Sequence, residues 1–216
     1  MTPADSSELS KREVNKRANY EKLLYAAKVA FLDQGYEGAT IRDIIRKSGL
    51  ASGTFYNYFP DKESIFRAIV DEYLFNLSQE LKKARQKADC LHAYIEPTFR
   101  IFFTHIAENS DLYRLGRRNE SALSSFYNSS LMEIIWQELI VDIEDAVKNN
   151  IIPRIDPQLL AASFIGLGHE LARLLINQSD RSPEEMAKFA SKMFIGGLAY
   201  YQSEQSGSHK THPVSH

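Results

Sequence analysis

One short stretch of this sequence concentrates side chains that can hydrogen-bond to a phosphate or to the edge of a base. The segment is GTFYNYFPDK, residues 53–62, and it holds hydroxyl, amide and ammonium groups. An asparagine amide can read adenine through two hydrogen bonds, and a threonine methyl can contact the thymine methyl. Tyrosine hydroxyls and lysine ammonium groups suit phosphate oxygens. These residue types favour contact with DNA.

A helix that packs on one side must present these groups. Phe55 and Phe59 are four residues apart, so they share one face of a helix that we expect over 52–59. Thr54, Asn57 and Tyr58 then lie away from the packed face. This arrangement leaves the polar side of the helix open to a partner.

The residues before this helix predict a helix-turn-helix. Thr40 with Asp43 three residues later is the pattern of a capped helix start, and Gly49 suits its end. Ser52 is expected to cap the next helix and Pro60 to stop it. In a helix-turn-helix the second helix enters the major groove. The same geometry also occurs in proteins that bind no DNA, where the tyrosines would only be half-buried.

The charge of the chain is uneven along its length. Residues 10–62 contain ten Lys and Arg against six Asp and Glu, a net charge of +4, which leaves −6 for the rest of a chain whose total is −2. The basic pairs at 11–12 and 16–17 suit a DNA backbone or a minor groove. A basic head on an acidic body is expected when one end of a protein meets a polyanion.

Helical periodicity runs through nearly all of the chain, so the predicted fold class is all-α. The first helix carries an apolar stripe of Tyr20, Leu23, Leu24, Ala27, Ala30 and Phe31 and is expected to end before Gly35. A long helix is expected over about 61–86, and further helices at about 88–108, 111–119, 122–149, 157–178 and 183–203. Capping residues before proline, at Asp156 and Ser182, mark two of these starts, and Glu185 completes a capping box at the second.

Composition excludes several classes of protein. With 216 residues, 44% of them hydrophobic and 25% charged, the chain has ordinary globular composition. Cys90 is the only cysteine, which excludes a disulfide framework and a zinc site built from cysteines. No signal peptide is visible, and no charge-free apolar stretch approaches the length of a transmembrane helix, about 18 residues. We therefore expect a cytoplasmic protein with no membrane association, metal or cofactor.

The stretch from Asn19 to Phe66 resembles the N-terminal domain of the TetR family of bacterial transcriptional regulators. Residues 53–59, GTFYNYF, meet the family pattern. That pattern is a small residue, Thr, an aliphatic or aromatic residue, Tyr, any residue, His or Tyr, and Phe. The lysine that follows in the family is met by Lys62. Tyr58 stands where many members have histidine, so a hydrogen-bonding ring is kept without a positive charge. The resemblance covers roughly the first third of the chain.

The resemblance implies roles for individual residues and a division into domains. Phosphates would be held by Thr40, Ser52, Tyr56, Tyr58 and Lys62, and the bases would lie nearest Arg42, Gly53, Thr54 and Asn57. The domains would be a flexible tail (1–10), a helix-turn-helix DNA-binding domain (11–66), a larger helical ligand-binding and dimerisation domain (67–203) and a second flexible tail (204–216). The expected partner is a double-stranded DNA operator.

Two apolar helices, 157–178 and 183–203, are the expected dimer interface. In a TetR-like protein they would pair with the same helices of a second subunit and form a four-helix interface in a homodimer. The alternative is that both helices belong to the core of one chain.

A small-molecule effector is expected among helices 88–150 and 157–178. The candidate ligand-binding residues combine aromatic, apolar and basic side chains: Phe99, Phe102, Phe103, Ile106, Tyr113, Arg114, Arg118, Phe126, Tyr127, Trp136, His169 and Arg173. Each of them could instead be an ordinary core or surface residue. Arg114 and Arg118 share a helix face and suit a carboxylate or phosphate. The segments YRLGRRNESALSSF and GGLAYYQ resemble fatty-acid-responsive family members, which implies acyl-CoA or another apolar ligand.

The predicted function is a ligand-responsive transcriptional regulator, most simply a repressor that binds a palindromic operator as a dimer. The alternative is an architectural DNA-binding protein without an effector. An all-α enzyme is the third class, since Glu133, Glu138 and the pair His169–Glu170 suggest a metal–carboxylate site. The paired Glu-x-x-His motifs of such sites are missing from the sequence, as are catalytic-triad, P-loop and dinucleotide signatures. We therefore expect no catalytic residues.

Overall fold

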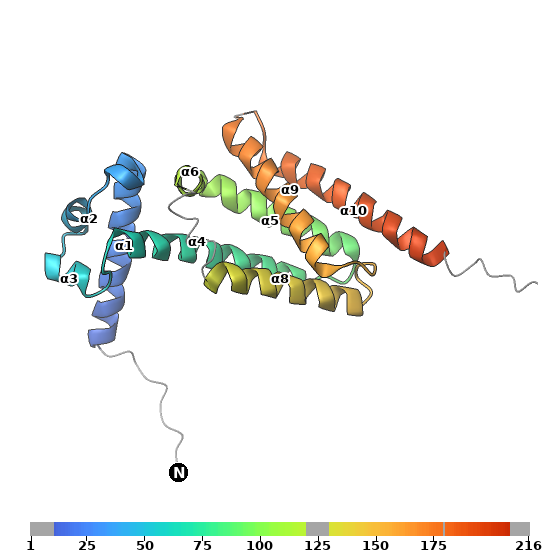
Figure 1. Ribbon diagram of the computed structural model, residues 1–216, viewed down its shortest axis with the longest axis horizontal. Helices are drawn as coiled ribbons and strands as arrows, with labels where there is room; N and C mark the ends of the chain where they lie inside the picture. Colours follow the sequence, from blue (N-terminus) through green and yellow to red (C-terminus); the bar gives the residue numbers. More distant parts are fainter. Residues whose placement is uncertain (1–10, 120–129, 179, 208–216) are drawn as a thin grey trace, which may run out of the picture. The chain divides into compact units, whose positions relative to one another are not determined.

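The computed structural model describes residues 11–119, 130–178 and 180–207, and every regular element in these ranges is an α-helix (Figure 1). The helices are α1 (Lys11–Gly38), α2 (Ile41–Ser48), α3 (Ser52–Tyr56), α4 (Lys62–Arg85), α5 (Leu91–Glu108), α6 (Ser110–Arg118), α8 (Ser130–Lys148), α9 (Pro157–Asn177) and α10 (Pro183–Gly207). The prediction of an all-α fold is confirmed. Part of the helix predicted over 122–149 lies outside the described residues.

The chain divides into two compact units. The first contains the residues up to Tyr73 together with Leu115–Asn119, and the second contains Leu74–Arg114 and the residues from 120 onward. Helix α4 begins in the first unit and ends in the second.

The first unit is built around three buried phenylalanines, Phe31, Phe55 and Phe66, one each from α1, α3 and α4. Phe31 meets Phe66 edge-on with ring centroids 5.3 Å apart. Such edge-to-face pairs are favourable beyond the apolar area that they bury. The predicted stripe on the first helix is confirmed for its members from Leu23 onward, which are buried, whereas Tyr20 at its start is partly exposed.

The predicted signals at the ends of α2 are confirmed. The Thr40 side chain and the Asp43 backbone and side chain form a reciprocal capping box at its start, and Gly49 ends it with φ 68° in the left-handed region. Gly35 also has positive φ, 74°, where α1 kinks, but helical structure resumes and continues to Gly38. The prediction that Gly35 takes a positive φ where the first helical run ends is therefore confirmed, whereas the short helical segment after it was not predicted.

Two predictions about α3 are wrong. Ser52 is the first residue of this helix and not its cap: the capping position is Ala51, which supplies no side-chain hydrogen bond. The helix also stops at Tyr56 and not at Phe59. The amide of Tyr58 bonds to the Phe55 carbonyl three residues back, which tightens the chain into a turn before Pro60.

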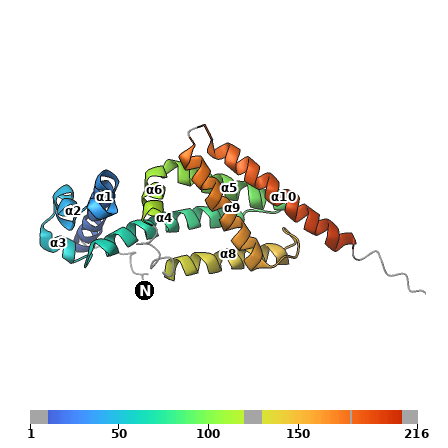
Figure 2. The ribbon, with the colours of Figure 1, turned by 45° about the horizontal axis from the view of Figure 1, so that its top comes forward.

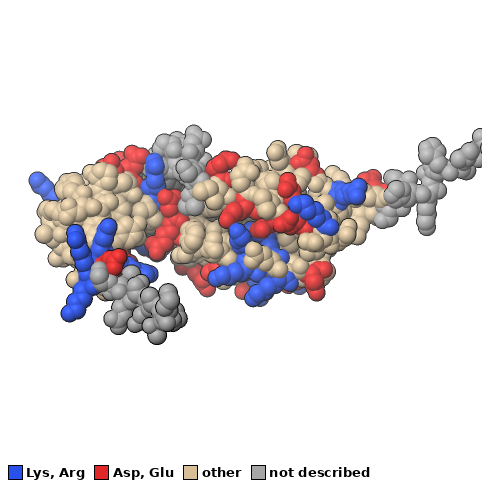
Figure 3. Space-filling model, turned by 90° about the horizontal axis from the view of Figure 1, so that it is seen from below, with Lys and Arg blue, Asp and Glu red and all other residues tan. Residues whose placement is uncertain are grey.

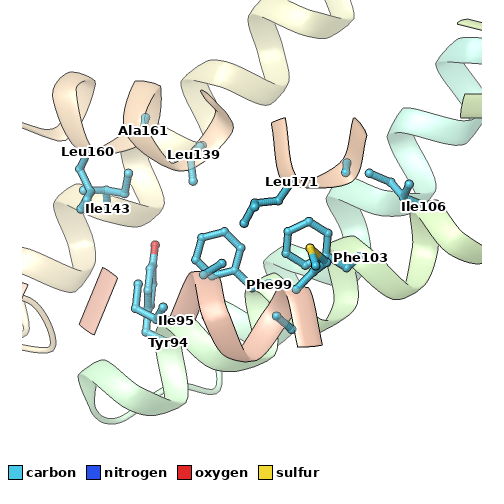
Figure 4. Packing of buried hydrophobic residues seen from close by; sticks show 14 of the residues in the cluster. Tyr94, Ile95, Phe99, Phe103, Ile106, Leu139, Ile143, Leu160, Ala161 and Leu171 are labelled. Atoms are coloured by element: carbon cyan, nitrogen blue, oxygen red, sulfur yellow. The ribbon is translucent and has the colours of Figure 1, made fainter. Parts of the chain in front are cut away.

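The second unit has one hydrophobic core, formed by α5, α8, α9 and α10 (Figures 2 and 4). Helix α10 packs along α5. Phe99 of α5 is fully buried and stacks on Phe164 of α9 with ring centroids 4.2 Å apart, while Phe194 of α10 lies 5.3 Å away on a tilt. The caps predicted at Asp156 and Ser182 are confirmed by their hydrogen bonds. Helix α10 ends at Gly207, four residues beyond its predicted end.

Two ion pairs join the end of α4 to α8 within the second unit. Arg85 contacts Asp142 at 2.8 Å, and Lys82 contacts Glu138 at 3.1 Å. The Arg85 side chain is only 7% exposed and that of Asp142 14%. A buried pair of this kind fixes two helices strongly, because removal of one partner leaves a charge without compensation.

Helix α9 has the length and composition of a membrane-crossing helix, a test that the core helices of soluble proteins also pass. In this structure Leu160, Leu171 and Leu175 of α9 are buried in the core of the second unit. Packing in this core therefore accounts for much of its apolar character.

Candidate nucleic-acid interface

Helices α2 and α3 and the turn between them form the predicted helix-turn-helix. Phe55 is fully buried and Phe59 is 4% exposed, so both side chains hold α3 and the following turn against the rest of the first unit. The Phe55 and Phe59 rings lie 6.0 Å apart, and Phe59 stacks on Tyr20 of α1 at 5.4 Å. A helix of five residues cannot stand alone, so this packing is what maintains it.

The opposite side of α3 is open. Tyr56 is 57% exposed, with its ring edge-on against Phe55. Ser52, Gly53 and Asn57 are also exposed, and Thr54 is half-buried. No atom lies within 4 Å of the place that a Cβ would take at Gly53, so another backbone can approach α3 closely there.

Thr40 and Arg42 lie at the start of α2. The Thr40 hydroxyl donates to Asp43 Oδ2 and accepts from the Asp43 backbone N–H. The Thr40 backbone N–H also donates to Asp43 Oδ2, at 3.1 Å, and the two hydrogen bonds that Thr40 donates to this carboxylate lower the pKa of Asp43 below its ordinary value of 3.8. The Thr40 hydroxyl is thus occupied in the capping box, while Arg42 is exposed.

Tyr58 and Lys62 are turned toward α1, so the prediction that Tyr58 lies away from the packed face is wrong. The Tyr58 hydroxyl donates to the Lys16 carbonyl at 3.0 Å. The Lys62 ammonium donates to the Tyr36 carbonyl at 2.8 Å and lies 4.5 Å from the centroid of the Tyr36 ring. No sequence pattern indicates these two contacts, because the partners are 42 and 26 residues apart along the chain. Phosphate contact by either residue stays a prediction.

The candidate effector residues of α5 are mostly core. Phe99, Phe103 and Ile106 are buried, and Phe102 is half-buried beside Gly168, where a Cβ would come within 3.2 Å of its ring. Tyr113 and Trp136 are half-buried and pack against the same core. The structure therefore brings these six side chains into one apolar region of the second unit.

The hydrogen bonds and ion pairs of Arg114 and Arg173 do not bring the polar effector candidates together at one place beside this apolar region. Arg114 donates to the Ile176 carbonyl at 2.8 Å, and Arg173 pairs with Glu170 at 2.9 Å. His169 is half-buried and Arg118 exposed. The remaining candidates, Phe126 and Tyr127, lie outside the described residues.

Sequence analysis missed several buried polar groups in the second unit. Besides the Arg85–Asp142 pair, Tyr94 of α5 is 4% exposed, and its hydroxyl has no hydrogen-bond partner among the described residues. Figure 4 shows this hydroxyl pointing toward α8 and α9, near Ile143 and Leu160. Burial raises the pKa of Tyr94, while Arg85 and Asp142 act on it in opposite directions. A tyrosine in an apolar stripe does not indicate from sequence that its hydroxyl will be buried without a hydrogen-bond partner.

Large apolar side chains on α9 and α10 remain exposed. Leu159 is 66% exposed, and on α10 Phe189 and Met193 are 52% and 59% exposed. The positions of Gly166, Gly196 and Gly197 are open, with no atom within 4 Å of an added Cβ. The single-chain core therefore covers only one side of these helices.

Within the described ranges no group of three or more His, Cys, Asp or Glu side chains is arranged to hold a metal ion. Glu133, Glu138 and His169, which suggested a carboxylate site, form no such group. Glu138 is instead paired with Lys82 of α4.

Comparison with known proteins agrees with this geometry. Residues 23–69 match the family described as bacterial regulatory proteins, tetR family. A structure from Syntrophomonas wolfei, described as a TetR-family transcriptional regulator, is 23% identical, with 82% of this chain and 93% of that chain covered and a TM-score of 0.68. Two others are assigned to fatty acid metabolism. A Clostridium perfringens regulator is 20% identical (79% and 94% covered, TM-score 0.64), and the fatty acid degradation regulator FadR of Bacillus halodurans is 16% identical (83% and 96% covered, TM-score 0.64).

At these identities the solved structures establish the fold, and the match over 23–69 establishes the kind of DNA-binding domain. The family consists of regulatory proteins and not of enzymes. Residues 23–69 therefore form the helix-turn-helix domain of the TetR family of bacterial regulatory proteins, and over most of its length the chain shares an all-helical fold with structures described as TetR-family regulators.

Proposed function

We propose that this protein is a ligand-responsive repressor that binds a palindromic operator as a homodimer in the cytoplasm. The observation that carries the proposal is the helix-turn-helix of α2 and α3, whose packed side is apolar and whose open side presents Tyr56, Asn57 and Gly53. We assign DNA binding to residues 11–66 and ligand binding and dimerisation to residues 67–203.

The open side of α3 has the chemistry to read a major groove. Asn57 can bond to adenine, and the exposed backbone at Gly53 lets the helix come close to the bases. Tyr56 can donate its hydroxyl to a phosphate, and Arg42 can reach a guanine edge or a phosphate. The predicted DNA contacts of Thr40, Ser52, Thr54, Tyr58 and Lys62 remain part of this proposal.

The exposed apolar side of α9 and α10 supports dimerisation. Leu159, Phe189 and Met193 are more than half exposed in the single chain, and the open glycines permit close helix approach. A second copy that places the same two helices against this side would form a four-helix interface with two-fold symmetry. A two-fold dimer would set the recognition helices about 34–36 Å apart, the repeat of successive major grooves.

The second unit supports an apolar effector. Its core is rich in phenylalanine, and relatives of the same fold are named as regulators of fatty acid metabolism or degradation. An acyl chain, free or as a CoA thioester, is the ligand class that we propose. If the effector binds more tightly to a dimer whose recognition helices no longer match the spacing of the operator grooves, effector binding would release the operator.

The DNA-binding proposal is tested with Tyr56→Ala and with fragments selected from the source genome by the purified protein. We expect wild type to enrich fragments that share a palindrome, and Tyr56→Ala to lose at least tenfold in affinity in a titration at fixed salt, with its dimer intact by light scattering. Tyr25→Ala, at another highly exposed tyrosine of the same unit, serves as the matched control. Equal affinities for Tyr56→Ala and wild type would contradict the assignment.

The effector proposal is tested separately, with palmitate and palmitoyl-CoA as probes. Either probe should raise the melting temperature and reduce operator binding, since a ligand that binds only the folded state stabilises it. If both probes leave melting and operator binding unchanged while the protein still binds DNA, the acyl class is wrong. The architectural alternative, a DNA-binding protein without an effector, would then be favoured.

A further inference from the structure

The basic residues at the start of α1 form a helical surface next to the helix-turn-helix. Helix α1 begins at Lys11, so Arg12 and Lys16 lie on a regular helix, both exposed. Neither forms an ion pair with an acidic side chain in the described part of the chain, whereas Arg17 is paired with Glu21 at 2.9 Å. On the face seen in Figure 3, long Lys and Arg side chains project together from the N-terminal unit at the left. Two uncompensated cations therefore stand on this part of α1.

Three contacts fix this surface beside α3. Arg12, Lys16 and Tyr20 are spaced four residues apart, so they lie along one side of α1. The Lys16 carbonyl accepts the hydroxyl of Tyr58, and the Tyr20 ring lies 6.2 Å from the Tyr58 ring and stacks on Phe59 at 5.4 Å. The residues that end the α3 turn thus bind the side of α1 that carries Arg12 and Lys16. The basic surface therefore lies next to the turn that ends α3.

The helical conformation decides which part of DNA this surface fits. An α-helix with side chains is about 10–12 Å across, whereas the minor groove of B-DNA is about 6 Å wide. Residues 11–17 therefore do not fit into a minor groove as a helix, although an extended arm of the same sequence would. Side chains on the flank of a helix can instead reach phosphates at the edge of the groove that α3 enters.

We propose that Arg12 and Lys16 form a second phosphate-binding surface on α1, which holds the DNA backbone beside the recognition helix. This inference rests on the proposed function, because it assumes that α3 faces a major groove. It adds two charged contacts for each protomer to the contacts of the helix-turn-helix itself. The contacts are independent of sequence, since they involve phosphates and not base edges.

The test counts the phosphates that the protein neutralises, and it does not require the operator. Binding to a random duplex of about 30 base pairs is measured by anisotropy between about 50 and 300 mM salt, for wild type and for the double variant Arg12→Gln/Lys16→Gln. Each phosphate contact contributes about 0.9 to the slope of log K against log salt. We expect the variant slope to be smaller by about 1.8 for each bound protomer. Glutamine keeps the helix propensity of the replaced residues.

The matched control is Lys83→Gln/Lys87→Gln, which removes two exposed charges with the same spacing from the second unit. Its slope should equal that of wild type. A slope unchanged in Arg12→Gln/Lys16→Gln, or reduced equally in the control, would overturn the inference. So would a loss confined to A·T-rich duplexes, which would indicate minor-groove contact. If wild type binds no duplex even at about 50 mM salt, the proposed function itself fails, and the two failures are thus distinguished.

Discussion

Replacement of Lys62 by methionine separates two roles for this residue, a contact with DNA and a structural contact within the first unit. In the structure the Lys62 ammonium lies 2.8 Å from the Tyr36 carbonyl and 3.4 Å from the Glu37 carbonyl, and 4.5 Å from the centroid of the Tyr36 ring. These carbonyls belong to the short helical segment that follows the kink at Gly35. Methionine has nearly the same helix propensity and lacks the charge.

The magnitude follows from these contacts. A hydrogen bond from a charged group contributes about 1.5–3 kcal/mol, and a cation–π contact at an exposed site about 0.5–1 kcal/mol. Because Lys62 is half-buried and its second hydrogen bond is long, we take the total at about 2 kcal/mol, near the lower end of the sum. That energy corresponds to a change of roughly 30-fold in a local opening equilibrium.

Native-state hydrogen exchange measures this opening directly. In Lys62→Met the amides of residues 36–39 and 62–66 should exchange roughly 30-fold faster than in wild type, because the end of α1 is no longer held against α4. The exposed Lys83→Met, in the same helix, is the matched control and should exchange as wild type does. Unchanged protection in Lys62→Met, with a salt slope for DNA binding reduced by about 0.9, would refute the structural role and leave a phosphate contact alone.

Three further predictions concern single groups. Hydrogen bonds from Thr40 lower the pKa of Asp43, so the capping box contributes stability above pH 3.8 that is lost as the pH falls through the lower pKa of the folded state. Hydrogen exchange of the α2 amides, measured as the pH is lowered, should show this loss in wild type and not in Asp43→Asn. Tyr94→Phe should raise thermal stability by about 1 kcal/mol, because it removes a buried hydroxyl that has no hydrogen-bond partner among the described residues. Since burial raises the pKa of Tyr94, wild type should also lose more stability than the variant as the pH rises above 10. Arg85→Met should cost about 3 kcal/mol in thermal unfolding, with much of the loss recovered in Arg85→Met/Asp142→Leu. A lower melting temperature for Tyr94→Phe, or a double variant no more stable than Arg85→Met, would contradict these predictions.

Local signals allowed the sequence to predict most of the scaffold. The capping boxes at Thr40 and Ser182 and the left-handed Gly49 depend on residues only a few positions apart, and each is confirmed. The end of α3 was predicted wrongly because a tightened turn competes with a helix over the same few residues. Periodicity does not distinguish these two conformations over so short a segment.

The site was less predictable because its decisive contacts are distant in sequence. The residue types of segment 53–62 indicated hydrogen bonding to DNA, but no pattern indicated that the Tyr58 hydroxyl bonds to the Lys16 carbonyl. In the second unit, aromatic residues predicted for a pocket are also what a packed core requires, so Phe99 and Phe103 fit both interpretations. The buried Arg85–Asp142 pair joins residues 57 positions apart, and neither was singled out.

Under the proposed function, the shortness of α3 links temperature to DNA binding. A five-residue helix persists only while Phe55 and Phe59 hold it in place, so loosening of the first unit removes the reading surface without loss of any contacting side chain. Bound operator acts in the opposite direction, because it stabilises the folded unit by mass action. Operator that is already bound by the proposed repressor should therefore stay bound through a heat challenge that prevents the free protein from binding empty operator.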